Sequence, residues 1–327
     1  MSEPWWAWAV VIGGLLVVLA VDLWIVDRGE AREFSMRQAG YWVSFYVALA
    51  VIFGIILWST SGPEKAGEFF AGYITEYSLS VDNLFVFFII MSRFAVPKAY
   101  QHKVLLVGIL LALVMRGIFI AVGAAALERF SWLFYVFGAF LVYTAINIIR
   151  QHVKGEEEDV KENLLLRWVR RSLPTTETYV GSKITVKIDG RRMVTPMLIV
   201  MIAIGSTDLL FALDSIPAIF GLTTDPFIVF TANAFALMGL RQLYFLLGGL
   251  LQRLVYISYG LAFILGFIGV KLVLEALHAS GVHWAPQIPI WVSLTVIGAT
   301  MVITTVASLV KARIDGRKSQ ETQAEQV

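Results

Sequence analysis

Two apolar segments of this 327-residue chain carry acidic side chains at matching positions. The first reads 76-EYSLSVDNLF-85 and holds Glu76 and Asp82, and the second reads 206-STDLLFALD-214 and holds Asp208 and Asp214. Even on the more lenient insertion scales, a carboxylate at the centre of a membrane helix costs about 2.5–3.5 kcal/mol. Four such groups indicate a function that offsets this cost, so we interpret them as candidate site residues.

The side chains around these acids favour a hard cation as ligand. Carboxylate, amide and hydroxyl oxygens suit Mn²⁺, Ca²⁺ or Mg²⁺. The candidate metal ligands are Glu76, Asp82, Asn83, Asp208 and Asp214, with the hydroxyl groups of Ser80 and Ser206 in supporting positions. The chain has no cysteine, and its four histidines fall in or beside expected loops, which disfavours zinc and copper: His102, His152, His278 and His283.

Two arginines, Arg116 and Arg241, also lie within apolar segments. If all four acids are ionised, the two guanidinium groups leave a formal charge of −2, which matches one divalent cation. Coupled carboxylates often share a proton, so a proton-coupled process is a second interpretation. A third interpretation is that Asp82 and Asp208 form structural ion pairs with the two arginines. Asp22 lies near the end of the first apolar segment. We interpret it as an interfacial cap rather than as a metal ligand.

The composition places these residues in a membrane. Hydrophobic residues make up 58% of the chain and charged residues 15%, with a mean hydropathy of +0.75. Apolar runs long enough to cross about 30 Å of hydrocarbon recur along the sequence. They predict an all-α polytopic membrane protein with nine transmembrane helices, near 7–26, 40–59, 68–92, 104–127, 131–149, 195–220, 227–246, 254–274 and 288–310.

Basic residues predict the orientation of these helices. Alternate connections hold 21 lysines and arginines, whereas the opposite connections hold three, Lys65, Arg129 and Lys271. Because positive charge favours the cytoplasmic side, we expect the N-terminus outside and the C-terminus in the cytoplasm of a protein in the cell membrane. The N-terminus lacks the basic region and cleavage site of a signal peptide and is interpreted as the start of a retained helix.

The connections divide the chain into membrane halves at 1–149 and 194–310, a cytoplasmic insert at 150–193 and a tail at 311–327. The insert contains an acidic run, 156–159, and then a basic amphipathic stretch suited to anionic lipid, 163–173. It continues with an alternating pattern around Asp189-Gly190, which predicts a β-hairpin. We interpret it as a linker that rests on the membrane or as a surface for protein partners.

The two acidic segments belong to an internal repeat. Both contain Ser-x-Asp-x-Leu-Phe, and an arginine follows 34 residues after Asp82 and 33 residues after Asp208. The segments are three spans apart and cross in opposite directions, which predicts two inverted three-helix repeats, spans 3–5 and 6–8, around a midplane site. Acids six residues apart do not share a face of a regular helix, so they can converge only where the helix is broken or where the cavity wraps around it. Gly205 and Pro217 are the candidate positions for a break.

Three longer runs carry a resemblance to a known family: 76-EYSLSVDNLFVF-87, 101-QHKVLLVGILLALVMRGIFI-120 and the stretch 208–247. With them, the chain resembles the TerC/Alx family of bacterial integral membrane proteins over nearly its whole length. The family is named for tellurium resistance, is linked to manganese efflux and metal homeostasis, and belongs with the LysE-type transporters of inverted three-helix repeats. The resemblance implies Mn²⁺ export, with Glu76, Asp82, Asp208 and Asp214 as the coordinating positions.

One position departs from the family pattern. Members commonly carry an acidic residue three positions before the aspartate of the second segment, and this chain has Gly205 there. A site with one carboxylate fewer would hold its ion more weakly, select another ion, or depend on Asp214 and Asn83. Tellurite is an oxyanion, so an acidic site does not fit it.

We therefore expect a secondary transporter, and specifically an exporter, of a hard divalent cation such as Mn²⁺, with no permanently bound cofactor. The sequence contains neither a nucleotide-binding loop nor the Gly-x-Gly-Asp motif of intramembrane aspartyl proteases, so we expect no enzyme and no direct use of ATP. The alternative is a non-transporting membrane scaffold for metal or tellurite stress-response partners, with structural Asp/Arg pairs. The expected partners are the ion, protons if transport is coupled, and the bilayer, but not nucleic acid.

Overall fold

The computed structural model describes residues 4–28, 36–130, 132–154, 174–176, 178–188, 191–247, 256–280, 282 and 284–324. Their helices are α1 (Trp5–Arg28), α2 (Met36–Ser61), α3 (Pro63–Arg93), α4 (Lys98–Arg129), α5 (Leu133–Lys154), α7 (Pro196–Phe220), α8 (Pro226–Met238), α9 (Leu240–Leu247), α10 (Ile257–Ala279) and α11 (Ile290–Ala324). Two short strands, β1 (Thr185–Ile188) and β2 (Arg191–Val194), lie between α5 and α7.

Most of these helices are long enough and apolar enough to cross a membrane. Within the described residues there are eight such segments, and they coincide with the second to the ninth predicted spans. The seventh predicted span is formed by α8 and α9 together, over Pro226–Leu246. The first predicted span is α1, whose apolar part, Trp5–Val21, is shorter. An all-α polytopic membrane protein is thus confirmed, with eight candidate spans and a short N-terminal apolar helix.

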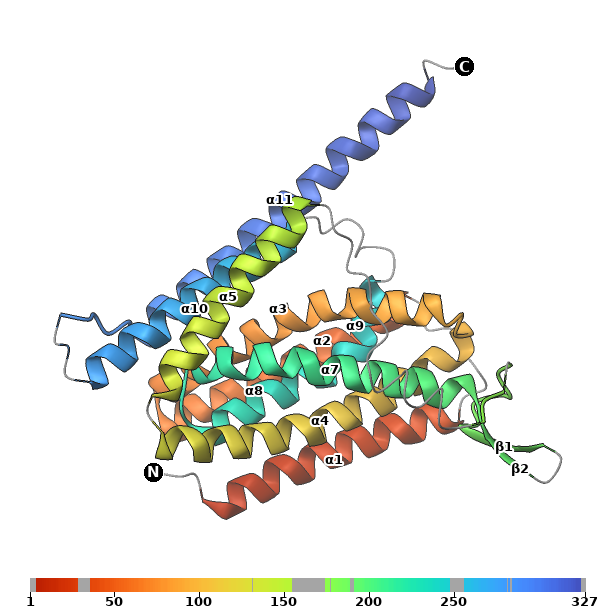
Figure 1. Cartoon of the computed structure of the whole chain (residues 1–327), viewed down its shortest axis with the longest axis horizontal. Coiled ribbons are helices and arrows are strands. Elements are labelled where there is room, and N and C mark those ends of the chain that lie inside the picture. Colours follow the sequence, from red (N-terminus) through yellow and green to blue (C-terminus); the bar gives the residue numbers. More distant parts are fainter. Residues whose placement is uncertain are drawn as a thin grey trace.

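The candidate site helices lie at the centre of the bundle (Figure 1). The span of α8 and α9 and the span of α3 are the most deeply buried, whereas few side chains of α2, α5 and α11 are buried. The most extensive packing of α3 is against α8, and that of α4 is against α7. The helices α5, α10 and α11 lie side by side along one flank, and α1 rests on the outside against α8 and α4 (Figure 1). The apolar core is therefore built around the helices that carry the acids.

Two glycines allow α5 and α10 to touch along their backbones. A Cβ atom at Gly138 would lie 2.8 Å from the carbonyl oxygen of Gly269, and a Cβ at Gly269 would lie 2.8 Å from the carbonyl oxygen of Gly138. Small residues permit such close approach between membrane helices, where van der Waals packing holds the bundle together. Neither position has room for a side chain.

The prediction of a helix break at Gly205 or Pro217 is wrong, because α7 is continuous through both residues. Pro217 lies in the last turn, where its missing N–H removes only one hydrogen bond near the helix end. Gly205 has a packing role instead, since a Cβ there would lie 2.4 Å from Cδ2 of Leu111 on α4. The acids are therefore carried on regular helices.

The predicted β-hairpin is confirmed. Strands β1 and β2 pair antiparallel with Ile188 opposite Arg191. The segment before β1 contacts the connection between α3 and α4, where the hydroxyl of Tyr179 donates to the carbonyl oxygen of Phe94 at 2.8 Å. Burial raises the pKa of Tyr179, which keeps this hydroxyl protonated as a donor. Residues 189–190 and 155–173, including the acidic run and the predicted amphipathic stretch, lie outside the described residues.

Candidate functional site

A single arginine joins three helices of the buried core. The side chain of Arg116 on α4 is 1% exposed and contacts two carboxylates, Glu76 on α3 and Asp208 on α7. Its Nη1 donates to Oε1 of Glu76. Its Nε and Nη2 donate to Oδ2 and Oδ1 of Asp208 at 3.4 and 3.3 Å. Acids from the two predicted repeats thus meet at one guanidinium.

Two neutral side chains complete the contacts of Arg116. Its Nη1 also donates to Oδ1 of Asn233 on α8 at 2.8 Å and to Oγ of Ser215 on α7 at 3.1 Å. The Asn233 amide nitrogen donates to the carbonyl oxygen of Val229 at 2.9 Å, which orients the amide oxygen toward the guanidinium. We refer to Glu76, Ser80, Arg116, Asp208, Ser215 and Asn233 as the Arg116 cluster.

Helix periodicity explains which residues join the cluster. Ser80 lies one turn after Glu76 on α3, and its hydroxyl donates to Oε1 of Glu76 at 3.2 Å. Ser215 lies seven residues after Asp208, which is about two turns, so both occupy one face of α7. Asp214 is turned roughly 100° from Ser215 and faces elsewhere. The continuity of α7 therefore separates its two acids.

The second oxygen of Glu76 is available for a ligand. Glu76 is fully buried, and its Oε2 accepts no hydrogen bond from any described residue. Two carboxylates and one guanidinium also leave one negative charge in excess when all three groups are ionised. A buried carboxylate oxygen without a partner is costly unless a proton or a cation binds it.

Two other predicted site residues, Asp214 and Ser206, form their hydrogen bonds outside this cluster. Asp214 accepts a long hydrogen bond, 3.5 Å, from the hydroxyl of Thr144 on α5. Ser206 donates to the carbonyl oxygen of Ala203 in its own helix. Arg241 is buried at the start of α9, and Asn83 is buried on α3. The side chains of Asp82 and Asp22 lie outside the described residues.

Because the side chain of Asp82 lies outside the described residues, the assembly of the complete ligand set stays a prediction. Among those residues, no group of three or more His, Cys, Asp or Glu side chains is placed to hold a metal ion. Two cluster members, Ser215 and Asn233, were absent from the sequence-based prediction. Asn233 could have been found as the one amide in the apolar stretch 226-PFIVFTANAFALM-238. Ser215 carries a weaker signal, because a serine in a membrane helix is common.

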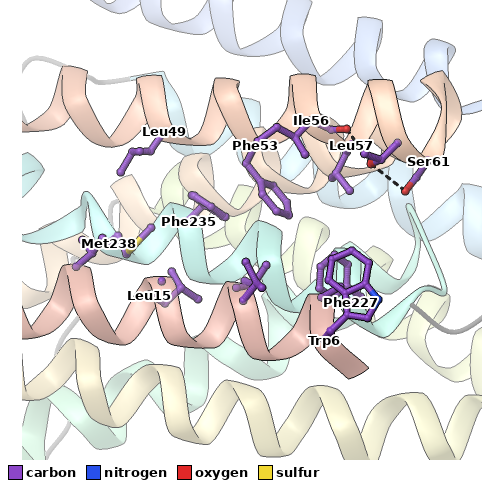
Figure 2. A pocket seen from close by; sticks show the side chains of 16 residues that line it. Trp6, Leu15, Leu49, Phe53, Ile56, Leu57, Ser61, Phe227, Phe235 and Met238 are labelled. Atoms are coloured by element: carbon purple, nitrogen blue, oxygen red, sulfur yellow. Dashed lines mark hydrogen bonds between the residues drawn. The ribbon is translucent and has the colours of Figure 1, made fainter. Parts of the chain in front are cut away.

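The pockets of the molecule differ in chemistry. One pocket of about 480 Å³ lies between α1, α2 and α8, where Leu15, Phe53 and Phe235 project into it (Figure 2). Its only hydroxyl groups are those of Thr60 and Ser61, and none of its described lining residues is charged. A second pocket, of about 640 Å³, includes Glu64, Glu68, Lys271, Glu275 and His278. Of these two pockets, the second, at the N-terminal end of α3, has carboxylates among its described lining residues.

A comparison with protein families gives a match over most of the chain. A family model described as "Integral membrane protein TerC family" matches residues 61–315, which include the whole Arg116 cluster. The chain belongs to the TerC family. This confirms the resemblance inferred from the three sequence runs and identifies a multi-pass integral membrane protein.

Relatives of this TerC-family chain cover most of its length. An "Uncharacterized membrane protein" of Mycobacterium tuberculosis is 47% identical over 313 residues, covering 91% of this chain and 79% of the relative. A second "Uncharacterized membrane protein", of Myxococcus xanthus, is 42% identical over 306 residues, covering 94% of this chain and 92% of the relative. A protein of Escherichia coli named "Putative membrane-bound redox modulator Alx" is 39% identical over 308 residues, covering 92% of each. No solved structure matches the TerC-family chain.

Proposed function

We propose that this TerC-family protein is a secondary transporter of a hard divalent cation, with Mn²⁺ as the ion that the family resemblance implies. The observation that carries the proposal is the buried meeting of Glu76 and Asp208, from two separate membrane segments, at Arg116. Charged residues within membrane segments typically face the bundle interior and mark ion pathways. The direction that we propose is export, as in the sequence-based prediction.

The donor atoms of the cluster suit such an ion. Oε2 of Glu76 is buried without a described hydrogen-bond partner, and the oxygens of Asp208, Ser215 and Asn233 lie around the same guanidinium. Carboxylate, hydroxyl and amide oxygens are the donors that Mn²⁺, Ca²⁺ and Mg²⁺ prefer. Asp82, Asn83 and Asp214 remain proposed ligands at further steps of the path.

Arg116 acts in this proposal as an internal counter-ion. Removing one partner of a buried ion pair costs about 3–5 kcal/mol, because the other charge stays buried and uncompensated. The guanidinium therefore stabilises Glu76 and Asp208 when no cation is bound. A divalent cation would compete with Arg116 for the same oxygens, so cation binding and the position of the Arg116 side chain are coupled.

The helix contacts support the proposed inverted repeat. The repeat equates α3 with α7, α4 with the span of α8 and α9, and α5 with α10. Under this exchange the contact of α3 with α8 becomes that of α7 with α4, and these are two of the most extensive contacts in the bundle. The contact of α5 with α10 is converted into itself and is the largest of all. Inverted repeats of this kind place a transport site at their interface.

An acidic pocket lies at the N-terminal end of the helix that carries Glu76. Glu64 and Glu68 lie in the first two turns of α3, on the same helix as Glu76, and Glu275 lies across the pocket on α10. With the proposed N-terminus outside, this end of α3 faces outward. Acidic clefts raise the local concentration of cations. The pocket is therefore suited to cation passage at the outer surface.

Transport by the full-length protein in lipid vesicles tests the proposal. Vesicles that enclose a dye quenched by Mn²⁺ would report entry of the ion into the lumen. We expect Glu76→Gln and Asp208→Asn to reduce the rate at least about tenfold, because each removes one charged oxygen donor. Glu128→Gln, an exposed carboxylate at the end of α4, serves as the matched control and should transport at the wild-type rate.

Two results would contradict the proposal. If the wild-type protein moves none of Mn²⁺, Ca²⁺ or Mg²⁺ across vesicles, it is not a transporter of hard divalent cations. If the folded Glu76→Gln and Asp208→Asn proteins both transport at the wild-type rate, the Arg116 cluster is a structural ion network. The scaffold interpretation would then be favoured, and changes within residues 150–193 should disturb function instead.

A further inference from the structure

We propose that the groove between α4, α7 and the β-hairpin binds an anionic phospholipid, with its phosphate on two lysines and an acyl chain against the two helices. The groove has a volume of about 530 Å³. Its walls come from α4, α7 and the segment that leads into β1: Lys103, Val107, Leu111, Ser182, Lys183, Ile184, Thr185, Leu198, Met201 and Ile202. This inference does not depend on the proposed transport function.

One end of the groove is positively charged. Lys103 and Lys183 are both exposed, and neither forms an ion pair with a carboxylate in the described part of the chain. The ammonium group of Lys103 donates to Oγ of Ser182 at 3.0 Å, which places a hydroxyl between α4 and the segment bearing Lys183. None of the described lining residues is acidic. Two ammonium groups and a hydroxyl are donors that suit a phosphate.

The rest of the groove is apolar and continues into the outer surface of α4. Lys103, Val107 and Leu111 follow one another at four-residue spacing and so lie on one face of the helix. The same face continues with side chains that are all exposed outside the bundle: Val114, Ile118 and Val122. On a membrane-spanning helix, such a stripe contacts the hydrocarbon of the bilayer. The groove therefore opens sideways into lipid, with its charged end at the membrane boundary.

This combination favours a lipid over a soluble anion. A soluble phosphate compound would use the lysines but leave Val107, Leu198 and Ile202 without a partner. A phospholipid satisfies both parts, since basic pockets between membrane helices bind anionic headgroups. The insert contributes Ser182 and Lys183, and the hydrogen bond from Tyr179 to Phe94 holds the insert against the end of α3. The hairpin segment thus completes a site that α4 and α7 begin.

Native mass spectrometry of the full-length protein in detergent, without metal ions, tests the site. The probes are dioleoyl phosphatidylglycerol, which is anionic, and dioleoyl phosphatidylcholine, which is zwitterionic. We expect the wild-type protein to retain the anionic lipid more tightly. A lysine near the membrane surface is worth about fivefold in affinity for anionic lipid, so Lys103→Gln with Lys183→Gln should weaken binding about thirtyfold.

Matched variants distinguish the site from general surface charge. Lys187→Gln removes an exposed positive charge from β1, outside the groove, and should bind as the wild type does. Val107→Asn keeps both lysines but removes apolar contact, so it should weaken retention of the anionic lipid. Thermal unfolding of each variant checks that it is folded.

Several results would overturn the inference. These are equal retention of the two lipids, undiminished binding by the double lysine variant, or a loss in Lys187→Gln as large as in that double variant. Full displacement of the lipid by millimolar inorganic phosphate, together with unchanged binding by Val107→Asn, would show a headgroup-only anion site. Because the assay contains no transported ion, a failure of vesicle transport leaves the lipid result intact.

Discussion

Arg116 on α4 holds both carboxylate oxygens of Asp208 on α7, with Nε to Oδ2 at 3.4 Å and Nη2 to Oδ1 at 3.3 Å. This two-point contact fixes the plane of the guanidinium and leaves Nη1 directed toward Glu76, Ser215 and Asn233. A planar group with donors in a fixed fork is required, because the three N–H donors of an ammonium group cannot reproduce these five contacts. The position of Glu76 relative to Asp208 therefore depends on this one side chain.

We expect Arg116→Gln to destabilise the protein by about 3–5 kcal/mol, because two buried carboxylates lose their counter-ion. Arg116→Lys should lie between this variant and the wild type, since it keeps the charge but not the fork. The measurement is the midpoint of thermal unfolding in detergent. Arg129→Gln, at the exposed end of the same helix, is the control and should unfold with the wild type. A stable Arg116→Gln protein would mean that the cluster is not held by ion pairing.

Substitution of Asn233 tests the neutral part of the cluster. Asn233→Leu should cost about 1–3 kcal/mol, because it leaves a buried N–H of Arg116 without this acceptor. Thr231→Val on the same helix is a matched control, since the Thr231 hydroxyl bonds only to backbone oxygens of its own helix. The control should cost less. Equal unfolding midpoints for the two variants would show that Asn233 does not support Arg116.

The glycines of the bundle should differ in their tolerance of alanine. Gly138→Ala places a methyl group 2.8 Å from a backbone oxygen of α10, so we expect a loss of about 1–3 kcal/mol from overpacking. Gly205→Ala meets only the flexible end of Leu111, which is exposed and can move, so its cost should be smaller. Gly298→Ala on α11 meets nothing within 4 Å and should be neutral or stabilising. Thermal unfolding orders the three, and the reverse order would contradict the helix packing described above.

Substitutions of Asp225 should separate the contribution of its helix cap from that of its ion pair with Lys65. Its Oδ1 accepts from the backbone N–H of Phe227 at the start of α8, and its Oδ2 contacts Lys65 at 2.5 Å. Asp225→Asn removes the charge but can keep the cap, so we expect a loss of about 0.2–1 kcal/mol for this partly exposed pair. Asp225→Ala also removes the cap and should cost about 0.5–2 kcal/mol more. Equal unfolding midpoints would show that the cap contributes nothing.

The membrane-spanning elements were predictable from sequence because their physical cause is local. An apolar run of bilayer length must form a helix that satisfies its own backbone, so the predicted span at 195–220 matches α7 within a few residues. The hairpin was predictable for a similar reason, since the Asp189-Gly190 sequence predicts a hairpin and the structure pairs Ile188 with Arg191. Local chemistry was sufficient in both cases.

The pairing within the candidate site was less predictable because it depends on packing between distant segments. The cost of burying charge pointed to Glu76, Asp208 and Arg116, but it could not assign Arg116 to both acids. Gly205 suggested a helix break, whereas the structure uses its small size to accommodate Leu111. Asn233 was missed because a single neutral amide disturbs a hydrophobic pattern far less than a charge does.

The unbroken course of α3 and α7 also limits how the protein can move. Because both helices are continuous through their acids, a separation of the Glu76 and Asp208 backbones requires a whole helix to tilt or slide. Such a movement would displace both ends of that helix together. The two ends of a rigid helix that tilts move in opposite directions, so opening of the bundle at one end would accompany its closing at the other.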